Sequence, residues 1–176
     1  MRQWPRPWAI KVRVLGLDPG NAITGYGVVE GRGNRLRHVA HGVIRTTAGD
    51  PPQERLRVLY EGAEALLVRY VPDAVAIEKL FFKQNVSTGI SVAQARGVLL
   101  LAAAKAECHV GEFSPTEMKA AVTGYGRADK QQLQEMVKRL LSLNERPRPD
   151  DAADALALAI CQIQIGMVQR RIEASQ

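Results

Sequence analysis

The sequence has few cysteines and no long apolar stretch. Its two cysteines, Cys108 and Cys161, stand singly in apolar segments, without the C-x-x-C spacing of a thiolate metal site or a redox pair. The longest uninterrupted apolar run, residues 98–104, has about seven residues, whereas a membrane-spanning helix needs about 20. The leader MRQWPRPWAIK has two prolines and lacks the apolar centre of a signal peptide. We therefore expect reduced, buried cysteines, no membrane segment and a cytoplasmic location.

Acidic residues are also in the minority. Lys and Arg number 24 against 18 Asp and Glu, which gives a net charge of +6 and a pI near 9.6. Hydrophobic residues make up 46% of the chain and charged residues 24%, which is the composition of a folded domain. At 176 residues, the chain is expected to form one domain. The excess of positive charge favours a polyanionic partner, and nucleic acid is the first candidate.

The chain does contain strand patterns, followed by alternating helices and strands. Three strand patterns separated by short turns indicate an antiparallel meander, and the later alternation indicates parallel strands. We expect an α/β fold with a five-stranded mixed sheet flanked by helices. The expected strands are 12–18, 24–30, 35–46, 73–79 and 108–113, and the expected helices are 52–70, 88–107, a short one after Ser114, 129–143 and one that follows the break at 144–149. We divide the chain into an irregular arm (1–11), a single domain (12–166) and a C-terminal tail (167–176).

Three aspartates crowd the start of the last helix, in the stretch RPRPDDAADALALAICQ (146–162). We interpret Asp150 as the N-cap, whose side chain accepts from an N–H of the first turn. Asp151 and Asp154 then remain, and they share one face of a helix that is apolar nearly all round. Two such carboxylates repel each other by about 4 kcal/mol at about 4 Å and an effective dielectric constant of about 20. Capping therefore explains one aspartate, although spacing alone also allows Asp150 and Asp154 to act together.

Two further acids lie where a carboxylate is costly. Asp18 ends the first strand, and Glu78 lies in an otherwise apolar strand. Each has a simpler interpretation: Asp18 could accept from the N–H of Gly20 in the turn, and Glu78 could form a salt bridge, although its neighbour Lys79 points to the other face. If both acids meet the two helix aspartates, the result is an all-oxygen cage that suits Mg²⁺ or Mn²⁺. Two such ions about 4 Å apart are typical of phosphodiester hydrolysis, with nucleic acid as the substrate.

Four stretches of the chain together resemble one family. VLGLDPGNAITGYGVVE, AIEKLFFKQN, QARG and DAADALALAI occur in family order between residues 12 and 165, and they resemble the RuvC family of bacterial Holliday junction resolvases. The resemblance implies a ribonuclease H-like fold in a single nuclease domain, a homodimer, and paired Mg²⁺-dependent nicking of four-way DNA junctions that leaves ligatable 5′-phosphate and 3′-hydroxyl ends. It also implies two Mg²⁺ ions per active site, which Mn²⁺ can replace, and the RuvA–RuvB branch-migration complex as a partner. The acidic tetrad of the family falls on Asp18, Glu78, Asp151 and Asp154.

The same resemblance implies residues that contact DNA. The junction-facing aromatic residue of the family, three positions after the strand glutamate, falls on Phe81, and a base stacked on it would contribute roughly 1–3 kcal/mol. Basic positions of the family fall on Lys119 and Lys130, which would bind phosphate or stabilise the scissile group. Lys83 and Arg96 are further candidates for contacts with the DNA backbone. The alternative for Phe81 is a place in the core, and for each basic residue a solvated surface.

Three other functions fit parts of the pattern. A related nuclease could act on another branched or RNA-containing substrate with the same fold and metal chemistry. A non-catalytic DNA-binding module would have little use for four carboxylates, because these repel phosphate in the absence of metal. The DPGN turn between two strands also resembles the phosphate loop of the actin and sugar-kinase superfamily, which needs two such domains around the nucleotide.

Two histidines lie on the third expected strand. His38 and His41 are three positions apart, and successive residues of a strand point to opposite faces. We therefore expect them to face opposite sides of the sheet and not to bind a metal ion together.

Overall fold

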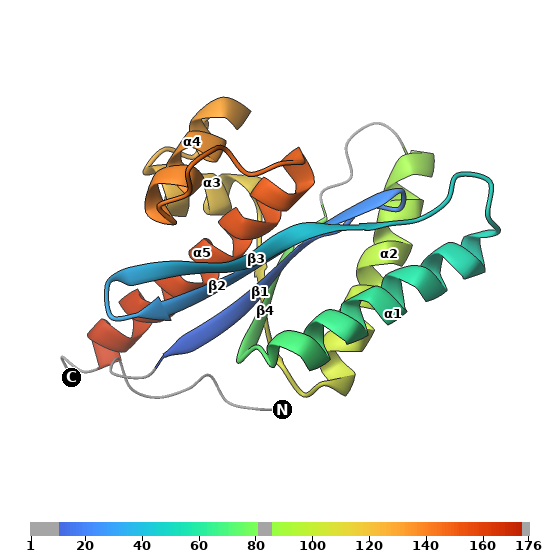
Figure 1. Cartoon of the computed structure of the whole chain (residues 1–176), viewed down its shortest axis with the longest axis horizontal. Coiled ribbons are helices and arrows are strands. Elements are labelled where there is room, and N and C mark those ends of the chain that lie inside the picture. The colour runs from blue at the N-terminus through green and yellow to red at the C-terminus, as the bar shows by residue number, and fades with distance from the viewer. Residues whose placement is uncertain (1–10, 81–85, 174–176) are drawn as a thin grey trace.

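The computed structural model describes residues 11–80 and 86–173 and contains one five-stranded sheet. The strand order is β3–β2–β1–β4–β5, in which β1, β2 and β3 are antiparallel neighbours and β4 and β5 run parallel to β1 (Figure 1). The strands are β1 (Val12–Asp18), β2 (Ile23–Arg32), β3 (Arg35–Arg45), β4 (Ala74–Glu78) and β5 (His109–Phe113). The predicted mixed sheet, a meander followed by parallel strands, is confirmed.

Helices cover both faces of this sheet. α1 (Pro52–Tyr70) and α2 (Val86–Lys105) lie on one face, and α5 (Asp150–Glu173) crosses the other, with α3 (Pro115–Thr123) and α4 (Lys130–Leu140) beside it (Figure 1). Most bounds lie within a few residues of the prediction, but α5 continues through most of the predicted tail. Nearly all of the predicted N-terminal arm lies outside the described residues. Among the described helices, none is long and apolar enough to cross a membrane.

The two faces of the sheet carry separate apolar cores. Leu17 of β1 packs into the core with α1 and α2, and Val14 packs into the core with α5. Cys108 lies in the first core and Cys161 in the second, both buried as predicted. Because successive side chains of a strand point to opposite faces, Asp18 points to the face opposite to Leu17, which α5 covers. β1 therefore ends in a carboxylate on a covered face.

Two glycines allow α5 to lie directly on the sheet. A Cβ atom on Gly16 would stand 1.9 Å from the carbonyl oxygen of Ala155, and one on Gly25 would stand 2.0 Å from the carbonyl oxygen of Asp151. Any side chain at these two positions would push the helix away, so β1 and β2 present bare backbone to the backbone of α5. Because Gly25 pairs with Asp18 across the two strands, this contact also places the first turn of α5 next to Asp18.

The third strand has an irregularity that alternation alone did not predict. The pairing of β2 with β3 shifts register between Val28 and Val29, and Val39 becomes an extra residue on β3. Such a bulge returns His38 and His41 to the same face. Their Nε2 and Nδ1 atoms are 2.8 Å apart, which is a hydrogen-bonding distance. The prediction that the two histidines face opposite sides is therefore wrong.

Candidate active site

Two carboxylates end neighbouring strands at the centre of the sheet. β1 and β4 run parallel and stay in register up to the residue before each acid, so Asp18 and Glu78 stand side by side at the carboxyl ends of these strands. Both follow residues of the α1–α2 core and therefore face α5. Asp18 does not close its own turn, because the N–H of Gly20 donates to Thr24 Oγ1 at 3.3 Å. The simpler interpretation of Asp18 as a turn residue is therefore wrong.

Helix α5 brings two more carboxylates to the same place. Its first turn packs on Gly25, the residue opposite Asp18. Asp151 and Asp154 are three positions apart and project from one face of α5, and both are half-buried. The structure thus brings four acids from β1, β4 and α5 near one another, and their role as a metal site stays a prediction.

Burial and mutual repulsion raise the pKa of three of these carboxyl groups. The pKa of Asp18 rises to about 8, first because the group is buried and then because Asp154, Glu78 and Asp151 are close. Burial raises the pKa of Asp154 to about 6, although Lys130 opposes the shift. Burial and Asp154 also raise the pKa of Glu78. Without a bound cation, Asp18 therefore holds its proton near neutral pH and shares it with Glu78 in a hydrogen bond.

A buried carboxylate with a structural role has a different environment in this protein. Glu30 on β2 is 4% exposed and forms ion pairs with three cations, Lys11, Arg13 and Arg37. Burial alone would raise its pKa, but hydrogen bonds from these three side chains lower the pKa to about 2. Among residues 11–80 and 86–173, no ion pair is present for any of the four clustered acids. Half-buried carboxylates without such ion pairs leave oxygen ligands available to a cation from outside the chain.

Asp150 does not cap α5. The N–H groups of Ala152 and Ala153 donate to the carbonyl oxygen of Pro149 at 3.0 and 3.3 Å. Asp150 therefore lies inside the first turn of the helix. Its carboxylate pairs with Lys130 Nζ at 2.9 Å and accepts from Gln134 Nε2 at 2.8 Å, and these two groups lower its pKa. The predicted N-cap is therefore wrong. Asp150 is nevertheless distinct from the other two aspartates, because α4 supplies its partners.

Two lysines flank the acidic cluster. Lys119 on α3 lowers the pKa of both Glu78 and Asp154, and Lys130 at the start of α4 lowers that of Asp154. These effects weaken with distance, so both ammonium groups lie close to the carboxylates. The structure places both lysines beside the acids, and their contact with phosphate stays a prediction.

Arg96 on α2 has partners within the protein. Its Nε donates to the carbonyl oxygen of Glu78 at 3.0 Å, and its guanidinium group pairs with Glu112 on β5. This arrangement ties α2 to the end of β4 and fixes the backbone that carries Glu78. A contact between Arg96 and DNA stays a prediction. Phe81 and Lys83, the remaining predicted DNA contacts, lie outside the described residues.

The donor set suits a hard divalent cation. It consists of carboxylate oxygens alone, the ligands that Mg²⁺ and Mn²⁺ prefer. The pKa values of Asp18, Glu78 and Asp154 are raised first by burial and then by the neighbouring acids, and both effects favour binding of a positive charge. In the described part of the chain, no three His, Cys, Asp or Glu side chains are already arranged as ligands of one ion.

Two residues that shape this site were not among the predicted site residues. Gly16 and Gly25 fix the height of α5 above the sheet and therefore the positions of Asp151 and Asp154. A glycine inside a strand is a sequence signal of close backbone approach, and both glycines lie within seven residues of Asp18 in the sequence.

Comparison with known proteins places this geometry in a family. Residues 14–162 match the sequence profile described as Crossover junction endodeoxyribonuclease RuvC. The protein of that name from Heliobacterium modesticaldum is 54% identical over 148 residues, which cover 84% of this chain and 91% of the relative. The one from Thermotoga petrophila is 53% identical over 150 residues, which cover 85% and 91%.

Solved structures agree with the sequence relatives. T. thermophilus RuvC in complex with a Holliday junction substrate superposes with a TM-score of 0.86 and 34% identity over 90% of this chain and 97% of that one. The yeast mitochondrial Holliday junction resolvase, at 16% identity and a TM-score of 0.66 over 94% of this chain and 86% of its own, shares the fold. The mixed sheet with helices on both faces is the ribonuclease H-like fold. The chain belongs to the RuvC family of crossover junction endodeoxyribonucleases.

Proposed function

We propose that this protein resolves four-way DNA junctions by hydrolysing one phosphodiester bond in each of two symmetric strands, in DNA recombination and repair. The observation that carries the proposal is the convergence of Asp18, Glu78, Asp151 and Asp154, none of which forms an ion pair within residues 11–80 and 86–173. The relatives named as crossover junction endodeoxyribonucleases, and the RuvC structure bound to a Holliday junction, support the choice of substrate. The products are nicks with 5′-phosphate and 3′-hydroxyl ends, which a ligase can seal.

The chemistry requires divalent cations. The four carboxylates would hold two Mg²⁺ ions, which Mn²⁺ can replace, and such a pair supplies an activated water nucleophile and stabilises the leaving 3′ oxygen. Asp18 has Glu78, Asp151 and Asp154 as charged neighbours, and it would bind a cation in its deprotonated form. Bound cations would offset the repulsion between these carboxylates and the DNA phosphates.

Basic and aromatic residues would orient the strand. Lys119 and Lys130 flank the acids, where their ammonium groups can bind the non-bridging oxygens of the scissile phosphate. We assign Phe81 to stacking on a base at the crossover, and Lys83 and Arg96 to contacts with the DNA backbone, as the family resemblance implies. These side chains would hold the bond in line with the carboxylate cluster.

Cutting two symmetric strands calls for two symmetric sites, which a homodimer provides. Five exposed residues of α2 lie at spacings of four and three along one stripe of the helix, and none of the five is charged: Ile90, Gln94, Gly97, Leu101 and Ala104. Ile90 and Leu101 are 52% and 54% exposed, and the small residues between them allow close approach of a second helix. We assign this α2 stripe to the contact between two copies of the chain.

Leu101→Glu is expected to keep the protein monomeric, because a charge within the α2 stripe would be buried in the contact without a partner. On a supercoiled plasmid with an extruded four-way junction, the variant should give nicked circles, whereas the wild-type protein should give linear DNA. Sedimentation velocity checks the oligomeric state. Val68→Glu is the control, because Val68 is an exposed apolar residue of α1 outside the stripe. A dimeric Leu101→Glu variant that still linearises the plasmid would refute the assignment.

The choice of substrate is tested by incubating the protein with four nucleic acids of matched sequence. These are a four-way DNA junction, a DNA duplex, a single DNA strand and an RNA–DNA hybrid. With Mg²⁺ we expect cleavage of the junction at least about 100-fold faster than of any other substrate, and without divalent cation none. Incubation of the products with a DNA ligase tests whether the nicks carry the 5′-phosphate and 3′-hydroxyl ends that sealing requires. Equal cleavage of the hybrid would assign the protein to a related nuclease activity instead.

The remaining assignments follow from the family resemblance. We propose that one nuclease domain comprises residues 12–166, that the enzyme works on cytoplasmic DNA, and that the RuvA–RuvB branch-migration complex delivers junctions to it.

A further inference from the structure

A groove opens beside the acidic cluster. It is a cavity of about 510 Å³ lined by Gln134 of α4, the segment 146–149, Asp150 and Asp151. Because Asp151 belongs to the acidic cluster, the groove leads directly to the proposed site of hydrolysis. We call it the 146–149 groove.

Asp150, on the wall of this groove, has its charge balanced by α4. Lys130 Nζ lies 2.9 Å from one carboxylate oxygen, and Gln134 Nε2 donates to the other at 2.8 Å. Arg148 lies near enough to lower the pKa of Asp150 slightly, but within the described residues no ion pair is present for Arg148. Within the described residues, the groove therefore has one exposed cationic side chain, that of Arg148, without an ion pair.

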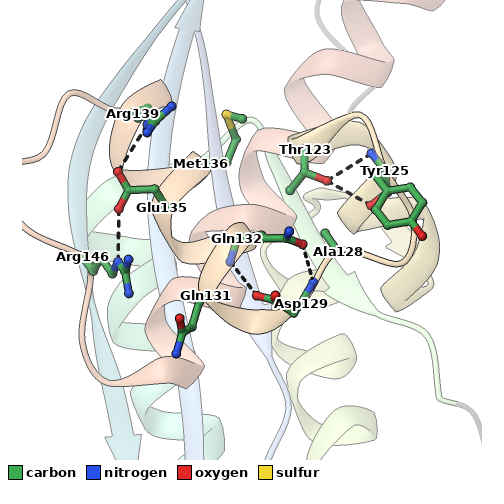
Figure 2. A pocket seen from close by; sticks show the side chains of 10 residues that line it. All are labelled: Thr123, Tyr125, Ala128, Asp129, Gln131, Gln132, Glu135, Met136, Arg139 and Arg146. Carbon is green, nitrogen blue, oxygen red and sulfur yellow. Dashed lines mark hydrogen bonds and ion pairs between the residues drawn. The ribbon is translucent and has the colours of Figure 1, made fainter.

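The second arginine of the groove is already held. Arg146 Nε donates to Glu135 at 3.1 Å, and the same carboxylate accepts from Arg139 at 3.3 Å (Figure 2). Arg146 stands between the 146–149 groove and a neighbouring cavity of about 470 Å³, drawn in Figure 2. Two arginines thus share one carboxylate, which adds a second surplus positive charge at the edge of the groove.

The backbone on both sides of Arg148 is anchored. Pro147 is buried, and the carbonyl oxygen of Pro149 accepts two N–H groups of α5. Both proline rings also fix their own backbone angle φ. Arg148 is therefore presented from a rigid base while its side chain stays exposed, which lowers the entropic cost of binding a ligand.

We infer that the 146–149 groove binds the phosphodiester backbone next to the scissile phosphate, with Arg148 as the residue that contacts it. The inference rests on the proposed function. A groove that continues from the acidic cluster can hold the strand that the cluster cuts, and the guanidinium group of Arg148 pairs well with phosphate oxygens. With cations balancing the four clustered acids, the surplus charge of the groove is positive and attracts this strand.

The test is the salt dependence of junction binding, measured by fluorescence anisotropy with Mg²⁺ in an Asp18→Asn background that does not cleave. Arg148→Gln should weaken binding about five- to tenfold at moderate salt and reduce the slope of log affinity against log salt by about 0.9, the loss of one phosphate contact. Arg148→Lys should retain most of the slope. Arg57→Ala, at an exposed arginine of α1 on the other side of the sheet, is the matched control and should change neither quantity.

A second measurement locates the contact on the strand. Single phosphates on either side of the scissile bond are replaced by neutral methylphosphonates. One replacement within about three nucleotides should weaken binding with Arg148 present and have no further effect with Arg148→Gln. The inference is overturned if Arg148→Gln behaves like Arg57→Ala, or if every replacement weakens both proteins equally. Failure of the wild-type protein to cut any junction would instead refute the proposed function.

Discussion

Asp18→Asn is expected to abolish cleavage of a four-way junction while leaving junction binding intact. The amide keeps the shape of the side chain but cannot supply a charged ligand at the centre of the cluster, between Glu78 and the helix aspartates. We expect a loss of about 10³-fold in single-turnover cleavage, which corresponds to about 4 kcal/mol of transition-state stabilisation. Binding, measured by anisotropy, should stay within a few-fold of wild type. Unchanged nicking by this variant would refute the assignment of the metal site.

The same substitution should stabilise the protein in the absence of metal. The pKa of Asp18 is raised from 3.8 to about 8, so the folded state binds this proton more tightly than the unfolded state does. The contribution of protonated Asp18 to the free energy of unfolding is therefore fully present below about pH 4 and is lost as the pH rises through about 8. At about pH 9, without metal, we therefore expect Asp18→Asn to have a higher free energy of unfolding than wild type. Urea denaturation with EDTA checks this, and Mg²⁺ should stabilise the wild type.

Glu30→Gln is the matched control, because it removes a buried carboxylate whose pKa is lowered by ion pairs, whereas the pKa of Asp18 is raised. Glu30 is held by Lys11, Arg13 and Arg37, and its pKa is lowered to about 2. Its contribution to stability is present above about pH 4.5 and is lost as the pH falls toward 2. Glu30→Gln should therefore destabilise the protein at neutral pH and leave cleavage unchanged. The two substitutions thus have opposite signs on stability and separate the functional acid from the structural one.

Short-range patterns were enough to predict the elements and to single out the candidate acids. Asp151 and Asp154 share a face because the helix repeats every 3.6 residues, and Asp18 and Glu78 end strands that the turn signals delimit. Their meeting requires one further fact, that β1 and β4 are parallel neighbours and end at the same edge of the sheet. The sequence patterns left this meeting as a condition, and the family resemblance named the four acids.

Predictions were wrong where a distant segment decides. Asp150 has the sequence context of an N-cap, but its carboxylate is taken by Lys130 and Gln134 on another helix. His38 and His41 would face opposite sides of the sheet only if the pairing of β3 with β2 were regular. One bulged residue between them puts both side chains on the same face. Neither partner choice nor register is encoded within the segment itself, so neither follows from its pattern.

The close contact between α5 and the sheet makes Gly25→Ala the most damaging small substitution that we predict. The added methyl group would stand 2.0 Å from the carbonyl oxygen of Asp151, and backbone at that position cannot turn aside as a side chain can. The first turn of α5 must move by about 1 Å, which is enough to lower catalysis about 10²-fold. Overpacking of this kind should also cost about 1–3 kcal/mol of stability. Single-turnover cleavage and urea denaturation measure both effects.

Gly31→Ala is the control for this prediction, because Gly31 lies on the same strand and the same face as Gly25. Its added methyl group would stand 2.6 Å from Cγ2 of Ile163, the end of a side chain that can rotate, at the opposite end of the contact with α5. This variant should lose some stability but cleave junctions at close to the wild-type rate. If Gly25→Ala cleaves as fast as Gly31→Ala, the helix position does not limit catalysis. Retained stability with lost cleavage, in contrast, would show that the backbone contact at Gly25 serves chiefly to hold Asp151 and Asp154 against Asp18.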